Sequence, residues 1–115
     1  KENNYLQAMI AVGMFENGYR NEAEAILRSL EERSLYSDEM GMYWRSERGW
    51  YWYQAPVETQ AMIIEAFNRL NYNPQNIDKM KVWLLKQKQT QRWKTSSATA
   101  EAVSALLITG NSSLL

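Results

Sequence analysis

The chain has 115 residues, enough for one domain, and its 13 Lys and Arg balance 13 Asp and Glu to a net charge of zero. This balance argues against a dedicated nucleic-acid binder, which usually carries a basic excess. Cysteine and histidine are both absent. Disulfides, thiolate or histidine catalysis, and zinc sites built from those side chains are therefore excluded within this sequence.

The first third of the chain predicts two helices joined by a tight turn. Apolar residues at the spacing i, i+3, i+4 and i+7 predict a helix over about 3–17 that ends at Gly18. The same spacing predicts a second helix over about 20–33, with Asn21 and Glu24 as a capping box. The linker is short, so we expect an antiparallel hairpin. The two apolar stripes consist of Leu6, Met9, Ile10 and Gly13, and of Ala23, Ile26, Leu27 and Leu30.

Residues 34–55 break the helical spacing. Six of the eleven residues from Tyr43 to Tyr53 are aromatic, and aromatic side chains favour extended structure. Gly49 suits a turn. The sequence therefore predicts a short aromatic-rich β-hairpin or an ordered loop near 42–53.

Three further helices are expected after the aromatic segment. Pro56 suits the first position of a helix that ends near Leu70. Asn73 and Pro74 begin another helix, which ends near Lys88. The cap candidates of the fifth helix, which ends at Gly110, are Thr95, Ser96 and Ser97. Two ion pairs at i, i+4 are also expected, Glu24–Arg28 and Glu65–Arg69.

These elements predict an all-α fold. About 70 residues are expected to be helical, well above the usual third. Two helical hairpins of about 30 residues follow one another, and the fifth helix would open a third, which is a weak internal repeat. Tandem antiparallel hairpins build a solenoid or a closed α/α ring.

Two stretches of the chain are similar to a known family. Residues 83–102 pass from a Trp-Leu-Leu helix end through a Gln-rich turn and Trp93 into an Ala/Thr-rich helix. The more specific stretch, residues 41–61, reads Gly41-Met42-Tyr43-Trp44, then Gly49-Trp50-Tyr51-Trp52-Tyr53-Gln54-Ala55-Pro56-Val57-Glu58-Thr59-Gln60-Ala61. Together they resemble bacterial alpha-2-macroglobulin-family proteins in the region equivalent to the thioester domain. That region is an α/α toroid, related in shape to terpenoid cyclases and prenyltransferases. The resemblance implies that residues 1–115 form a single domain that is about half of such a toroid.

The resemblance also implies a role in a protease inhibitor. In that family a bait region is cleaved, the chain rearranges, and the protease is caged. Members with a thioester use a Cys-x-Glu-Gln motif, whereas this sequence has no cysteine and its Glu58-Thr59-Gln60 lacks the sulfur. The expectation is therefore a non-catalytic, cofactor-free scaffold that acts with the remainder of its parent chain. The family implies a periplasmic, cell-envelope or extracellular location.

A second interpretation is a carbohydrate-binding or glycan-processing α/α-barrel module. Aromatic rings stack on sugar rings, so Tyr43, Trp44, Trp50 and Trp52 are a candidate aromatic surface. Large aromatic side chains also anchor long loops to a core, and this structural interpretation is favoured. A glycosidase would need two carboxylates at a defined separation. The candidates are Asp38, Glu39, Glu47, Glu58 and Glu65.

A third interpretation is a helical-repeat interaction module. The segment from Lys79 to Lys94 holds six positive charges and no acid. Lys79, Lys86 and Lys88 could line a groove for an acidic partner, although a solvated helix face is the simpler interpretation. Trp83 and Trp93 are expected in the core rather than stacked on bases.

The sequence also carries expectations about exposure and association. Half of a ring exposes apolar flanks beside its first and fifth helices, so we expect the chain to self-associate. No apolar run approaches the roughly 20 residues of a membrane span, and neither a membrane nor nucleic acid is an expected partner. An initiator Met and a signal peptide are both absent, so we expect a piece of a longer protein.

Overall fold

The computed structural model describes residues 3–45, 55–90 and 103–106. This part of the chain is mostly helical, as expected, and also contains one small antiparallel sheet. The elements in chain order are α1 (Asn4–Glu16), α2 (Arg20–Glu32), β1 (Leu35–Ser37), β2 (Gly41–Tyr43), α3 (Ala55–Leu70) and α4 (Pro74–Thr90). Residues 103–106 are helical as well, and the rest of the expected fifth helix lies outside the described residues.

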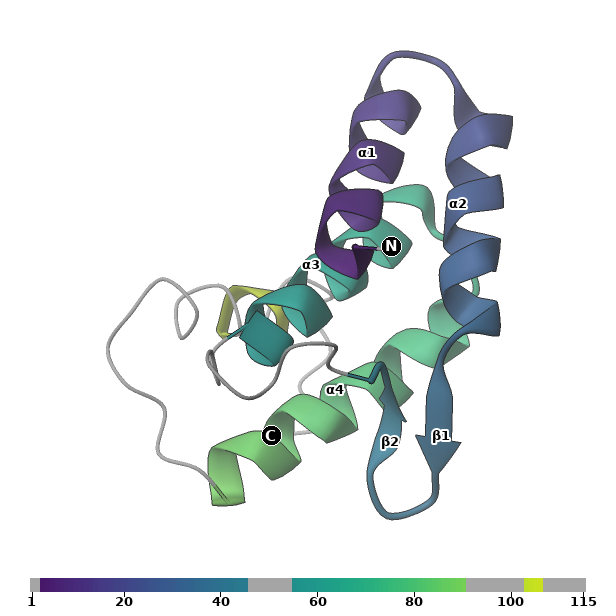
Figure 1. Ribbon diagram of the computed structural model, residues 1–115. Coiled ribbons are helices and arrows are strands. Elements are labelled where there is room, and N and C mark those ends of the chain that lie inside the picture. The colour runs from purple at the N-terminus through teal and green to yellow at the C-terminus, as the bar shows by residue number, and fades with distance from the viewer. Residues whose placement is uncertain (1–2, 46–54, 91–102, 107–115) are drawn as a thin grey trace.

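The helices α1 and α2 form the expected antiparallel hairpin (Figure 1). The side chain of Asn3 caps α1 by accepting a 3.0 Å hydrogen bond from the backbone N–H of Leu6. At the turn, Gly18 has a φ of 90°, a conformation that glycine adopts without strain.

The start of α2 differs from the prediction. Its N-cap is Tyr19, which makes no side-chain capping hydrogen bond, so the capping box at Asn21 is wrong. The helix begins at Arg20, and Asn21 therefore already lies within the first turn. Glu24 instead accepts a 3.0 Å hydrogen bond from Nε of Arg20, one turn before it, whereas the expected partner Arg28 lies one turn after it.

The helices α3 and α4 form a second hairpin, and α3 is the central element of the fold. It packs against α1, α2 and α4, which lie around it in Figure 1. The expected pair of Glu65 and Arg69 is confirmed at 3.4 Å, and Arg69 also binds Glu16 of α1. The buried side chains of α3 are Val57, Gln60, Ala61, Ile63, Ile64, Ala66, Phe67 and Leu70.

A β-hairpin that was not expected precedes the segment near 42–53 and overlaps its start. Its strands pair antiparallel with Tyr36 opposite Met42, so Met42 and Tyr43 belong to the second strand. The turn predicted at Gly49 lies outside the described residues. The hairpin extends beyond the end of α2, and β2 packs on α4 (Figure 1).

The packing of β2 on α4 requires a glycine. Gly41 has a φ of 77°. A Cβ atom there would collide with the backbone carbonyl oxygen of Lys79 and would lie 3.0 Å from Cβ of Val82. The missing side chain lets the strand approach the helix backbone directly.

The apolar stripe that predicts α1 is not the buried face of that helix. Leu6, Met9 and Ile10 are exposed, whereas Ala8 and Ala11 are completely buried. The small side chains of the alanines allow α1 to lie close to both α2 and α3. The expected apolar flank beside the first helix is therefore present. None of the helices in the described part of the chain combines the length and the hydropathy that a membrane crossing requires.

Candidate functional site

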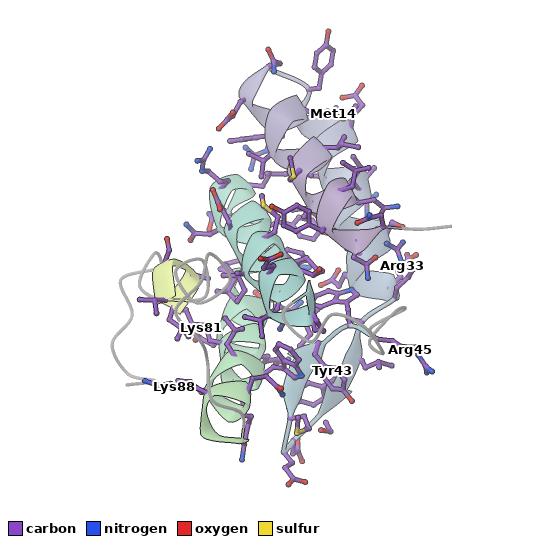
Figure 2. The ribbon with its side chains drawn as sticks, turned by 60° about the vertical axis from the view of Figure 1, so that its left-hand side comes forward. Met14, Arg33, Tyr43, Arg45, Lys81 and Lys88 are labelled. Carbon is purple, nitrogen blue, oxygen red and sulfur yellow. The ribbon has the colours of Figure 1, made fainter. Side chains whose placement is uncertain are left out.

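The aromatic residues at the end of the β-hairpin pack inside the protein. Trp44 is only 7% exposed, and its indole Nε1 donates a 2.8 Å hydrogen bond to the carbonyl oxygen of Leu30. Tyr43 is half-buried and stacks on Trp83 of α4, with 6.3 Å between ring centroids and 13° between ring planes. Figure 2 shows Tyr43 beside the hairpin strands.

This placement limits the candidate aromatic surface. Because Trp44 is buried and hydrogen-bonded, it offers no free ring face to a sugar. The expectation that Trp83 packs in the core is confirmed, since its side chain is buried. Trp50 and Trp52 lie outside the described residues, as does Trp93.

The most informative polar side chain here is Gln60 of α3, for which no structural role was predicted. Its amide Nε2 donates to the carbonyl oxygen of Met42 at 2.8 Å and to that of Met80 at 3.1 Å. The side chain is 2% exposed. One amide thus joins β2, α3 and α4. We call Met42, Trp44, Gln60, Met80 and Trp83 the hairpin junction.

Gln60 carried a recognisable signal in the sequence. It stands four residues before Ile64 and seven before Phe67, so it shares the apolar stripe of α3. An amide on an apolar stripe becomes buried, and a buried amide needs hydrogen-bond partners. This spacing could have marked Gln60 as a structural tie.

A second polar cluster fixes the α3–α4 turn to α2. The Oε2 atom of Glu31 accepts hydrogen bonds from the side-chain amides of Asn73 and Asn76, both at 2.6 Å. Asn71 and Asn73 hold positive φ angles of 51° and 42°, which asparagine tolerates better than most residues. Burial raises the pKa of Tyr72, and the nearby Glu31 carboxylate raises it further. The contacts of Glu31 hold this turn in its conformation.

Two arginines join other pairs of elements. Arg33, after the end of α2, donates from Nη2 to the side-chain oxygens of Asn4 at 2.8 Å and Gln7 at 2.7 Å, both on α1. Arg20, at the start of α2, donates from Nη2 to the carbonyl oxygen of Leu70 at 2.9 Å, at the end of α3. A cation at that end also complements the helix dipole.

The basic residues of α4 fall into different environments. Lys79 is exposed, with its ammonium 5.2 Å from the ring centroid of Tyr36, and Lys88 is exposed near the end of the helix. Lys86 is half-buried. Lys81 is completely buried, so its side chain does not belong to a solvated face. Figure 2 shows Lys81 on the side of α4 nearest the helical residues 103–106.

Burial has an electrostatic consequence for Lys81. Loss of hydration lowers the pKa of its ammonium group, and the carboxylate of Asp78 opposes this shift. The aliphatic stem of a buried lysine also fills apolar space.

The candidate carboxylates are spread over several elements. Asp38 accepts a 3.1 Å hydrogen bond from the hydroxyl of Tyr36, which raises the pKa of Tyr36. Glu39 is exposed, Glu65 binds Arg69, and Glu47 lies outside the described residues. Glu58 is half-buried in the first turn of α3, where its negative charge interacts favourably with the helix dipole. Among the described residues, no group of three or more acidic side chains is arranged to hold a metal ion.

No protein-family model matches the chain, and no curated protein or solved structure shows significant similarity to it. A functional assignment from the structure therefore rests on the contacts just described. Five side chains each connect separate segments of the fold through hydrogen bonds. They are Trp44, Gln60, Glu31, Arg33 and Arg20.

Proposed function

We propose that this chain is a non-catalytic helical scaffold segment of an alpha-2-macroglobulin-like protease inhibitor. The scaffold role is supported by one observation above the others. The buried side-chain amide of Gln60 donates hydrogen bonds to backbone carbonyl oxygens of two neighbouring elements, β2 and α4. Donors used in this way hold a fold together, and they are not available to a substrate.

The inhibitor role is our interpretation of the motifs in residues 41–61 and 83–102, which resemble that family. The tandem hairpins α1–α2 and α3–α4 are consistent with a segment of an α/α toroid. In the proposed assembly the segment acts with the remainder of its parent chain. It supplies packing and surface, and the trapped protease is its indirect partner. The family would place it in the periplasm, the cell envelope or outside the cell.

The experiment uses this sequence together with the segments that flank it in its gene. A caging inhibitor slows digestion of a large protein substrate but leaves cleavage of a small peptide intact, because only the peptide reaches the caged protease. We expect this difference in rates after incubation with a protease. If neither rate changes with any of a panel of endopeptidases, the inhibitor proposal is wrong.

A variant pair tests the scaffold role within the same assay. Gln60→Leu removes the two hydrogen bonds of the amide, whereas the control Glu32→Gln changes an exposed position of α2. A scaffold predicts that Gln60→Leu lowers inhibition only as far as it lowers the folded fraction. Loss of inhibition with an unchanged folded fraction would mean that Gln60 acts directly in the chemistry or in binding.

A further inference from the structure

The outer face of α1 is apolar and exposed. Leu6 is 49% exposed, Met9 44% and Ile10 43%. Gly13 completes the row, and nothing lies within 4 Å of the place where its Cβ would be. These four residues are spaced i, i+3, i+4 and i+7, so they lie on one side of the helix over about 10 Å. We call them the outer stripe.

The outer stripe lies on a helix that is apolar on both sides. Its inner face packs on α2 and α3 through the buried Ala8 and Ala11. No charged residue occurs from Asn4 to Phe15, and the first charge of the helix is Glu16. A surface helix normally presents charged side chains to water, whereas a helix that is apolar all round is buried. The composition of α1 therefore fits a helix that is covered on its outer side as well.

We propose that the outer stripe binds the outer stripe of a second copy of this chain, with the two α1 helices antiparallel. In a twofold pair, residues near the axis lie close to the same residues of the second copy. A charge in the middle of the contact would therefore be repelled by an identical charge. The outer stripe has no charge at its middle, where Met9 and Ile10 lie. Two copies of the outer stripe can therefore meet without repulsion between like charges.

Side-chain size selects the antiparallel arrangement. When Met9 lies opposite Ile10 of the second copy, the same register places Leu6 opposite Gly13. The large side chain of Leu6 then fills the open space over Gly13, and this happens twice in the pair. A parallel pair would place Gly13 opposite Gly13 and leave a void.

The ends of the helix favour the same register. Asn3 falls opposite Glu16 of the second copy, whose carboxylate binds Arg69 and can accept a further hydrogen bond from the side-chain Nδ2 of Asn3. The contact is small, because each copy offers only three half-exposed apolar side chains. We therefore expect a weak dimer that forms reversibly as concentration rises.

Sedimentation velocity on the 115-residue chain tests the dimer. The expected result is a shift from monomer to dimer as concentration increases. Ile10→Lys introduces a charge near the axis, and we expect it to remain monomeric at every concentration with an unchanged circular dichroism spectrum. The matched control is Tyr36→Ser, which changes a 57% exposed ring on β1 and should behave as the parent chain does. A parent chain that stays monomeric, or an Ile10→Lys variant that dimerises like the parent, overturns the proposal.

Single cysteines test the register, because the chain contains none of its own. Leu6 and Gly13 lie about 10 Å apart along α1, and a disulfide requires Cα atoms within about 7 Å. An antiparallel pair therefore predicts that a mixture of Leu6→Cys and Gly13→Cys chains crosslinks much faster than either variant alone. Rapid crosslinking of either variant by itself would show a parallel pair, which contradicts the proposed register. Crosslinking no faster than that of a Tyr36→Cys control would show that the stripe makes no contact.

The dimer and the proposed inhibitor role are measured separately. Sedimentation and crosslinking use the 115-residue chain alone, whereas protease caging is measured with the flanking segments present. Absence of caging leaves the dimer result intact, and absence of a dimer leaves the caging result intact.

Discussion

The indole Nε1 of Trp44 donates a 2.8 Å hydrogen bond to the carbonyl oxygen of Leu30. Leu30 lies in the last turn of α2, and its carbonyl oxygen also accepts a 3.1 Å hydrogen bond from the backbone N–H of Arg33. The Trp44 side chain therefore fills the core and adds a second donor to the end of a helix. It fixes the chain after β2 to the end of α2, and the aromatic segment begins from this fixed point.

Replacing Trp44 by Phe keeps an aromatic ring but removes the N–H donor. We expect Trp44→Phe to lower the free energy of unfolding by about 1–3 kcal/mol, because the hydrogen bond to Leu30 is lost and the smaller ring leaves space in the core. Urea unfolding followed by circular dichroism measures the change. The control Tyr36→Phe removes an exposed hydroxyl and should change stability by less than about 0.5 kcal/mol. Equal midpoints for Trp44→Phe and the parent would contradict this role of the indole.

Gln60 allows a comparison of two substitutions of similar size. Gln60→Leu removes both donors and leaves the carbonyls of Met42 and Met80 without this partner, which should cost about 2–4 kcal/mol. Gln60→Glu at neutral pH places a carboxylate against two carbonyl oxygens in a buried site, so we expect an even larger loss. Thermal unfolding at pH 7 ranks the three proteins. A Gln60→Glu variant more stable than Gln60→Leu would mean that the site accepts a charge.

Two glycines are expected to respond to alanine in opposite directions. Gly41→Ala adds a methyl group against the backbone of α4 at a φ of 77°, and we expect a loss of about 2–4 kcal/mol. Gly13→Ala adds a methyl group in open space within α1, and we expect a gain of up to about 1 kcal/mol. Unfolding curves at low protein concentration, where the chain is monomeric, test both. A Gly41→Ala variant as stable as the parent would rule out the close approach of β2 to α4.

The buried Lys81 predicts a pH dependence of stability. Burial holds its pKa in the folded protein below the unfolded value of about 10.5. Between these two pKa values the unfolded chain binds more protons, so stability rises with pH across this window. In Lys81→Met this contribution is absent. We therefore expect the parent chain to gain stability relative to Lys81→Met as pH rises from neutral towards about 10.5.

Because the parent chain and Lys81→Met share all other titratable groups, the contributions of those groups cancel in the difference between their unfolding free energies. Tyr36 and Tyr72 have raised pKa values, and both remain in the variant. A difference in unfolding free energy that stays constant with pH would show that Lys81 is charged to the same extent in the folded and unfolded states.

The helices of this fold could be predicted from the sequence because each has helical spacing of apolar residues and some have clear boundary residues. Pro74 marks the first residue of α4, and Gly18 follows the end of α1. The short strand β1 was missed because three residues are too few to show a period of two. The hairpin of β1 and β2 was therefore not predicted, and the hairpin or loop expected near 42–53 lies mostly outside the described residues.

Burial was harder to predict than secondary structure. Both sides of α1 are apolar, so its spacing predicts a helix without indicating which side faces the core. The larger residues Leu6, Met9 and Ile10 suggested a core face, but close packing on two neighbouring helices selected Ala8 and Ala11. Lys81 was assigned to a solvated face by residue type, and its burial depends on contacts that residue type does not encode.

The exposed side of α2 differs in character from that of α1. Its exposed residues are Arg20, Asn21, Glu22, Ala25, Arg28 and Glu32, and all but one of them are polar. Two chains joined through their first helices would thus present hydrophilic surfaces at both far ends. A third chain would therefore find no apolar surface to bind on the exposed side of α2.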